Sequence, residues 1–221
     1  MPPFIHRPAT ADMNVLVIAP HPDDEAIGCG GTLCNHSARG DRIIAVFLTS
    51  GELGLKKLPR DRAWKIRESE AARSQRILGI AATHFLRLPD WYLGKQIRNA
   101  AKLLRPVLKR EKPGIIYLPH PAEWHPDHQA TLRIVRAAFR GCGLPVPAIR
   151  AYEVWTPITE PHHIEDITKT MARKLRAVRA HRSQFSEFDY ARAVQGLNQY
   201  RGEMNTRFRY AEVFQNFDLK T

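Results

Sequence analysis

The sequence predicts an α/β fold in which a mostly parallel sheet is covered by helices on both faces. Short apolar, β-branched segments alternate along the chain with segments of helical periodicity, a pattern typical of right-handed crossovers between parallel strands. The chain has 221 residues, 43% of them hydrophobic, enough for a core on each side of a sheet. Two clusters of His and acidic residues follow predicted strands. Parallel sheets bind ligands at the carboxyl ends of their strands, so we expect the functional site there.

Predicted strands and helices alternate along the first half of the chain. Residues 14–20, NVLVIAP, form a short apolar run that predicts a strand buried on both faces. Residues 24–38 are predicted to form a helix that Gly40 ends, and residues 42–51 a second buried strand. Residues 62–79 have apolar positions at helical spacing and a terminal glycine, which together predict a helix.

The second half continues the pattern. Residues 83–90 predict a third strand, and residues 95–110 a basic amphipathic helix. Residues 113–120 predict a fourth strand, residues 126–140 a helix, and residues 149–157 a fifth strand.

Two further helices, at residues 166–182 and about 189–205, complete the predicted elements. The sequence has no repeat, linker or shift in composition, so residues 13–221 are predicted to form one domain. Met13 directly precedes the first strand, and residues 1–12 are therefore expected to be a flexible extension.

The cysteines and the N-terminus indicate the compartment. The three cysteines are odd in number and have no CxxC spacing, which favours a reducing environment over a disulfide framework. Residues 1–12 lack the apolar core of a signal peptide, and no apolar run approaches the length of a membrane span. We expect a cytoplasmic protein without a membrane span, whose oligomeric state the sequence leaves open.

The net charge is +12, from 34 Lys and Arg against 22 Asp and Glu. Such an excess suits an anionic partner, such as an acidic or phosphorylated glycan, a lipid headgroup or nucleic acid. The basic residues are spread over several predicted helices, so a solvated basic surface is the favoured interpretation.

The first polar cluster is PHPDDE, which includes His21, Asp23, Asp24 and Glu25. It follows the first strand and begins a helix, where free N–H groups and the helix dipole favour carboxylates. Helix capping alone does not explain two adjacent carboxylates beside a histidine. A divalent cation does, because it offsets their repulsion and binds a neutral imidazole.

The second polar cluster is EWHPDH, which includes Glu123, His125, Asp127 and His128 and follows the fourth strand. Pro126 suits the first position of a helix, and a helical first turn would place His125 and His128 on one face. HxxH alone is a weak signal. Two His/Asp clusters that both end parallel strands predict a shared metal site.

Spacing assigns the roles. His21 and Asp24, at i and i+3, can reach one metal ion, and His128 can supply a third ligand. Asp23 is then a general base for a water molecule. His125 could stabilise an oxyanion as an imidazolium and protonate a leaving amine, with Asp127 holding its tautomer and charge. Glu25 is expected to be a supporting or capping group.

The paired motifs PHPDDEAIGCGGTL and HPDH resemble the LmbE-like, or PIG-L, family of zinc-dependent N-acetylglucosamine de-N-acetylases. TSGELG, RESEA, KLRAVRAHRSQ and YAEVF are also similar to the family pattern. The resemblance implies a Rossmann-like sheet and removal of an acetyl group from an N-acetylated amino sugar.

By motif position, the resemblance implies His21, Asp24 and His128 as zinc ligands, Asp23 as the base and His125 as the electrostatic catalyst. It places Arg67 where a family arginine can contact substrate; a salt bridge with Glu70 or nearby acids is the alternative. The ligand set would also accept iron(II) or cobalt.

Aromatic residues also follow strand ends. Trp124, Trp91 and Tyr92 could stack on a sugar ring. We assign Trp124 a substrate-binding role, whereas burial beneath a loop is the favoured interpretation of Trp91 and Tyr92.

Three other functions compete with amino-sugar deacetylation. A metal-dependent amidase could act on a thiol conjugate or another N-acyl substrate. A nucleic-acid-binding protein would fit the charge, but the sequence lacks an aromatic-interleaved basic stripe. A dinucleotide-binding fold is rejected, because acids stand where its glycine-rich phosphate loop would be.

Overall fold

The fold was analysed in a computed structural model, which describes residues 13–185, 188–205 and 207–219. The predicted extension, residues 1–12, lies outside the described residues, and the single domain expected for residues 13–221 stays a prediction.

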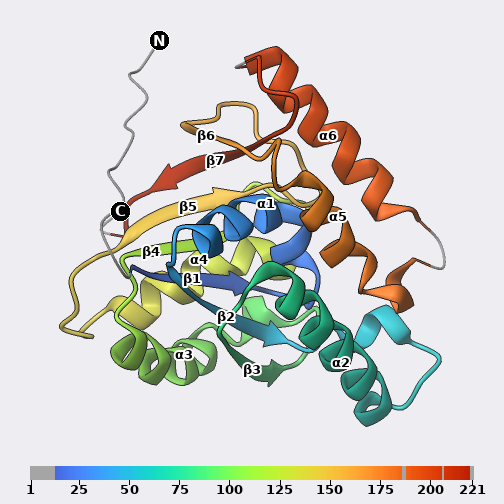
Figure 1. The fold of residues 1–221 in the computed structure, drawn as a ribbon. Coiled ribbons are helices and arrows are strands. Elements are labelled where there is room, and N and C mark those ends of the chain that lie inside the picture. Colours follow the sequence, from blue (N-terminus) through green and yellow to red (C-terminus); the bar gives the residue numbers. More distant parts are fainter. Residues whose placement is uncertain (1–12, 186–187, 206, 220–221) are drawn as a thin grey trace.

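A seven-stranded sheet forms the centre of the molecule, with the strand order β3-β2-β1-β4-β5-β7-β6 (Figure 1). The five strands from β3 to β5 are parallel, whereas β7 runs antiparallel to both β5 and β6. The strands are β1 (Asn14–Ala19), β2 (Arg42–Thr49), β3 (Ala82–Leu88), β4 (Ile115–Pro119), β5 (Ala148–Tyr152), β6 (His163–Asp166) and β7 (Ala211–Phe217).

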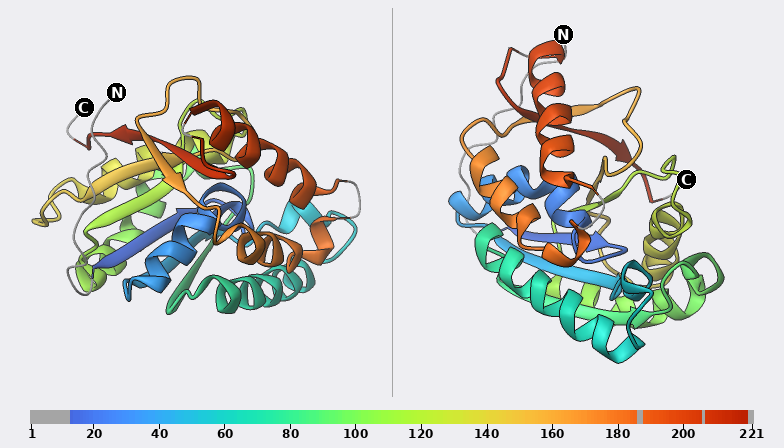
Figure 2. Two further views of the ribbon diagram at one scale, coloured as in Figure 1. Left: turned by 45° about the horizontal axis from the view of Figure 1, so that its top comes forward. Right: turned by 90° about the vertical axis from the view of Figure 1, so that its right-hand side faces the viewer.

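Helices cover both faces of the sheet, as Figure 2 also shows. The alternation of side chains along β1 separates two cores: Val15 and Val17 face one, Leu16 and Ile18 the other. The first core packs against α1 (Asp24–Ala38), α2 (Arg60–Leu78), α5 (Met171–Arg179) and α6 (Tyr190–Asn205). The second packs against α3 (Ile97–Glu111) and α4 (Pro126–Phe139).

The predicted α/β fold with a mostly parallel sheet is confirmed, but its C-terminal part differs from the expectation. The fifth strand stops at Tyr152, and the residues after it form a loop. The helix expected at 166–182 is shorter, and the antiparallel strands β6 and β7 were not predicted. The sequence HIED of β6 has too few apolar residues to indicate a strand at the sheet edge.

A buried ion pair ties the last strand to the first helix. Glu212 on β7 accepts hydrogen bonds from the backbone N–H groups of Gly31 and Thr32 on α1, at 2.9 and 2.8 Å. Lys174 on α5 donates to the same carboxylate at 2.6 Å and to Asn198 on α6 at 2.8 Å. Lys174 and Glu212 are almost completely buried, so each depends on the other for charge compensation.

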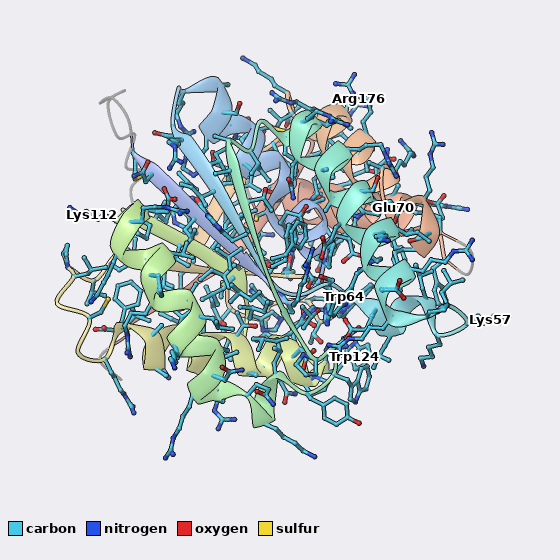
Figure 3. The ribbon with its side chains drawn as sticks, turned by 90° about the horizontal axis from the view of Figure 1, so that it is seen from below. Lys57, Trp64, Glu70, Lys112, Trp124 and Arg176 are labelled. Carbon is cyan, nitrogen blue, oxygen red and sulfur yellow. The ribbon has the colours of Figure 1, made fainter. Side chains whose placement is uncertain are left out.

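Surface features agree with the composition. Figure 3 shows basic side chains projecting around the outline, with Lys57, Lys112 and Arg176 on separate parts of the molecule. Within the described residues, none of the helices has the length and apolar character that crossing a bilayer requires. The three cysteines are free and buried. A cytoplasmic location stays a prediction.

The Lys174–Glu212 pair generates a stability prediction. Lys174→Met leaves the Glu212 carboxylate buried without a counter-charge, so it should lower the free energy of unfolding by about 3–5 kcal/mol. Lys174→Met/Glu212→Gln should recover part of that loss, and Lys169→Met, at an exposed position, should change little. Urea denaturation measures all three. Equal stability of Lys174→Met and Lys169→Met would contradict the role of the pair.

Candidate metal centre and active site

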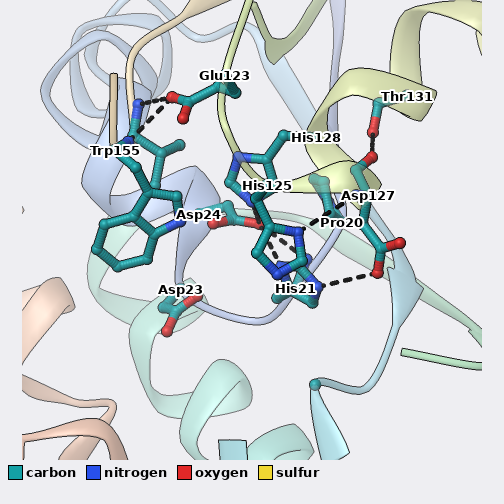
Figure 4. Close-up of polar contacts among 12 residues, drawn as sticks. Pro20, His21, Asp23, Asp24, Glu123, His125, Asp127, His128, Thr131 and Trp155 are labelled. Carbon is teal, nitrogen blue, oxygen red and sulfur yellow. Dashed lines mark hydrogen bonds and ion pairs between the residues drawn. The ribbon is translucent and has the colours of Figure 1, made fainter. Parts of the chain in front are cut away.

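Parallel pairing of β1 with β4 brings the two polar clusters to one edge of the sheet (Figure 4). His21, Asp23 and Asp24 lie where β1 turns into α1. His125 and His128 lie where the chain enters α4 after β4. All five side chains are buried or nearly so.

The Asp24 carboxylate lies between two imidazoles from opposite halves of the chain. Its Oδ2 atom is 3.2 Å from Nδ1 of His21 and 3.3 Å from Nε2 of His128. Burial would raise the pKa of Asp24, but the charges and hydrogen bonds of His128 and His21 hold it well below its usual value. Asp24 is therefore an anion at neutral pH.

His21 contacts Asp24 through Nδ1 and is oriented by two further carboxylates through Nε2. Nε2 lies 3.1 Å from Oδ1 of Asp90 and 3.3 Å from Oδ2 of Asp127. Both carboxylates are acceptors, so the proton belongs on Nε2, which leaves Nδ1 directed at Asp24. Burial lowers the pKa of His21, but the hydrogen bonds to Asp127, Asp24 and Asp90 raise it well above its usual value. A metal ion would displace the proton on Nδ1.

Asp90 was not identified from the sequence. It lies two residues after the end of β3, so it reaches the same edge of the sheet as the two clusters. Its Oδ2 accepts the Leu53 N–H at 2.9 Å, which fixes the carboxylate beside His21. An acid at the end of a predicted parallel strand was the signal that could have found it.

The residues present fit a divalent metal ion. Within the described part of the chain, Asp24 Oδ1 and His128 Nδ1 are buried without a hydrogen-bond partner, and His128 Nε2 has only its contact with Asp24 at 3.3 Å. A cation would satisfy the Asp24 oxygen and one ring nitrogen of His128. Ligand atoms of His21, His125 and His128 lie within 4.8 Å of one another, as do those of His21, Asp90 and Asp127. Asp90 and Asp127 already accept backbone N–H bonds, so they suit orientation better than coordination.

Asp23 is held in a strained conformation at the start of α1. Its φ of 127° is rare for a residue other than glycine. Glu25 accepts the Asp23 N–H at 3.1 Å, which agrees with the supporting role expected for it. Burial raises the pKa of Asp23 to about 6, with Arg67 opposing and Asp24 reinforcing the shift.

Arg67 is buried beside Asp23 and does not face the solvent. It is 2% exposed, and its Nη2 donates to the Pro22 carbonyl at 2.6 Å and to Asp23 Oδ2 at 3.4 Å. The salt bridge with a nearby acid is therefore present, with Asp23 as the partner. A substrate contact for Arg67 stays a prediction.

His125 differs from the expected imidazolium. Its Nδ1 accepts the Asp127 N–H at 3.2 Å, which places the ring proton on Nε2. Burial, together with the charges of His21 and His128, lowers the pKa of His125 to about 4. The ring is thus neutral at pH 7 and offers its Nε2–H as a donor.

Asp127 also differs from its expected role. Its side chain does not hold His125: Oδ2 accepts the Trp91 N–H at 2.7 Å and Oδ1 the Leu93 N–H at 2.9 Å. Only its backbone N–H reaches the His125 ring. Asp127 therefore orients His21 and fixes the turn at residues 91–93. Trp91 and Tyr92 in this turn are 47% and 49% exposed, so the expectation that they are buried beneath a loop is wrong.

Glu123 and Trp124, which precede His125, differ in exposure. Glu123 is fully buried and accepts the N–H groups of Val154, Trp155 and Thr156 at 2.8–3.1 Å, which holds the loop after β5. Trp124 is 59% exposed, and its ring centroid lies 5.4 Å from that of His125.

Comparison with known proteins identifies the family to which the chain belongs. The family described as GlcNAc-PI de-N-acetylase, PIG-L, matches residues 16–139, and the chain belongs to this family. Family and relatives are named for deacetylation, which indicates a hydrolase of N-acetyl amide bonds.

Three individual proteins illustrate the similarity in sequence and in structure. A diacetylchitobiose deacetylase of Thermococcus kodakarensis is 34% identical over 200 residues, covering 83% of this chain and 74% of the relative. The structure of N,N'-diacetylchitobiose deacetylase from Pyrococcus horikoshii has a TM-score of 0.82 at 30% identity, covering 94% of this chain and 85% of that one. The 4-carboxy-2-hydroxymuconate hydratase GalB of Pseudomonas putida, at 20% identity and a TM-score of 0.79 over 93% and 96% of the chains, shares the fold.

The ligand assignment generates a prediction on metal content. Loss of a residue that only orients a ligand costs roughly 10–100-fold in metal affinity, and loss of a ligand should cost more. Asp90→Asn should therefore weaken binding, and His128→Ala should abolish it. His163→Ala, on the edge strand β6, is the control. Metal analysis and chelator competition measure the order. A His128→Ala protein with a full metal complement would refute the assignment.

Proposed function

We propose that this protein is a metal-dependent hydrolase that removes the acetyl group from an N-acetylated amino sugar. One observation carries the proposal: a buried carboxylate, Asp24, lies 3.2 and 3.3 Å from two imidazole nitrogens, with a second carboxylate on the preceding residue. Membership of the PIG-L family and the names of the relatives support the choice of substrate.

His21, Asp24 and His128 would hold the metal ion. When bound there, a divalent cation supplies a Lewis acid that lowers the pKa of water and polarises the acetamide carbonyl. Two nitrogens and one carboxylate suit zinc, and iron(II) or cobalt would accept the same donors.

Asp23 is the proton carrier of the proposed reaction. Its carboxylate takes a proton from the attacking water while the water oxygen bonds to the acetyl carbon. Asp23 then gives that proton to the amide nitrogen as the C–N bond breaks. Acetate and the free amino sugar are the products, and the carboxylate returns to its initial state. A pKa of about 6 suits both transfers near neutral pH.

His125 stabilises the developing oxyanion as a neutral donor. Because its Nδ1 accepts the Asp127 N–H, the Nε2–H is available for the oxygen of the acetyl group. In this scheme the donor is positioned before the reaction begins, and Asp23 supplies the proton that the amine needs.

The second candidate function keeps the metal centre and changes the N-acyl substrate, for example to a thiol conjugate. The fold alone does not decide between them, since it also supports a hydratase. Acetate release from a panel of N-acetylglucosamine derivatives and other N-acyl amines distinguishes the two functions.

Removal of the proposed base should separate turnover from metal binding. Asp23→Asn keeps the shape of the side chain, and asparagine tolerates a positive φ. Turnover should fall by about 10²–10⁴-fold while the metal content is unchanged. Steady-state kinetics and metal analysis on the same sample measure both. If the Asp23→Asn protein turned over at the wild-type rate, Asp23 would not be the general base.

The donor role of His125 predicts a graded pair of variants. His125→Ala removes the donor and should lower kcat by about 10²–10³-fold. His125→Gln keeps an N–H group and should retain more activity than His125→Ala. An activity in His125→Gln no higher than in His125→Ala, with both proteins folded and metal-loaded, would speak against a simple hydrogen-bond donor.

A further inference from the structure

His181 and Glu25 are two buried polar side chains to which the proposed reaction assigns no step. His181 lies between α5 and a short 3₁₀ helix, Arg182–Gln184, and is 1% exposed. Glu25, in the first turn of α1, is fully buried. Within the described residues, Glu25 Oε1 and both ring nitrogens of His181 are buried without a hydrogen-bond partner. Such atoms are costly in a folded protein, so each needs an explanation.

The unpartnered atoms of the two residues lie next to each other. His181 Nε2 is 4.0 Å from Glu25 Oε1, about 1 Å longer than a hydrogen bond. Burial, together with the charge of Arg67, lowers the pKa of His181 to about 3, so the imidazole is neutral. A neutral imidazole can donate to a carboxylate or accept from a carboxylic acid. The pair can therefore form a hydrogen bond in either protonation state of Glu25.

The second oxygen of Glu25 holds the backbone of the proposed general base. Oε2 accepts the Asp23 N–H at 3.1 Å. The φ of Asp23 is 127°, a strained value that persists only where the surroundings fix it. Glu25 thus has one oxygen on the strained residue and the other directed at His181.

Helix α2 supports both ends of this arrangement. Its buried Glu70 accepts the N–H of Ser183 at 2.8 Å and the hydroxyl of Ser183 at 2.6 Å, which fixes the turn that carries His181. Arg67, one turn earlier on the same face of α2, donates to the Asp23 carboxylate. The base and the turn at His181 are therefore held by the same helix.

We propose that His181 is a positioning residue for Asp23: its hydrogen bond to Glu25 keeps Glu25 in place, and Glu25 keeps Asp23 in its strained conformation. The inference rests on the proposed function, in which Asp23 moves the proton. A displacement of about 1 Å at a reacting group costs on the order of 10²-fold in rate. His181 therefore affects turnover through the position of the Asp23 carboxylate.

Replacement of His181 should separate positioning from core packing. His181→Leu fills the space but removes both ring nitrogens, and it should lower kcat by about 10–100-fold with KM and metal content little changed. His181→Gln places an amide near the position of Nε2 and should recover part of the loss. A wild-type kcat in His181→Leu, or a kcat in folded His181→Gln no higher than in His181→Leu, would overturn the proposal.

His36→Leu is the matched control for the loss of a buried histidine. His36 lies on the same helix as Glu25 and is 3% exposed, but its partners are Asp41 and Tyr117. Its replacement should lower stability in urea denaturation and leave kcat unchanged. An equal fall of kcat in His36→Leu and His181→Leu would mean that general destabilisation causes both.

A double-mutant cycle tests whether His181 acts through Glu25. Glu25→Met removes both carboxylate oxygens and should itself lower kcat. In that background, His181→Leu should change kcat by less than about 2-fold, because the connection is already absent. A further loss as large as that in the otherwise wild-type protein would show that His181 acts by another route.

NMR of ring-¹⁵N-labelled histidine distinguishes failure of the contact from failure of the proposed function. The His181 signals are those that His181→Gln removes, and Glu25→Met should shift them. Unchanged His181 signals in Glu25→Met would overturn the proposal. Shifted signals in a protein that releases no acetate would support the contact and contradict the deacetylase. Acetate release that His181→Leu leaves unchanged would overturn the positioning role and leave the deacetylase standing.

Discussion

The convergence of two imidazoles on one buried carboxylate is the constraint on which the rest of the site depends. Asp24 is supplied by the start of α1, and its partners come from the end of β1 and the start of α4. They meet because β1 and β4 are adjacent and parallel. Buried groups of this kind are costly unless a charge compensates them. In the proposed site a divalent cation would provide that compensation, and it would account for the adjacent acids in the motif PHPDDE.

The surrounding residues act mainly by orientation. Asp90 and Asp127 hold His21 through its Nε2 atom. Glu25 accepts the Asp23 N–H. Arg67 donates to the Asp23 carboxylate and to the carbonyl of the preceding residue. Asp127 has a second task, since the same side chain fixes Trp91. The positions of His21, the proposed metal ligand, and of Trp91 are therefore linked through one carboxylate. This link gives a physical reason why Asp127 is a buried acid: its carboxylate contacts His21 and the backbone of Trp91 and Leu93.

The sequence indicated the parallel part of the sheet and both polar clusters, because apolar runs, terminal glycines and Pro126 are local signals. It did not indicate β6, whose HIED sequence looks like a loop, or the early end of β5, which depends on Glu123 accepting three N–H groups of the following loop. Asp90 was missed as a site residue because its role depends on a contact with His21, 69 residues away in sequence. The protonation of His125 also depended on the fold, since burial and two neighbouring imidazoles lower its pKa.

Anomalous diffraction from crystals of the metal-loaded protein tests the central claim most directly. The account predicts one strong peak bonded to His21 Nδ1, an Asp24 oxygen and His128 Nε2, at about 2.0–2.2 Å as zinc sites require. Data on either side of the absorption edges would identify the element in the same crystals. A peak bonded to His21, Asp90 and Asp127 instead, or a protein that loads no metal at all, would contradict it.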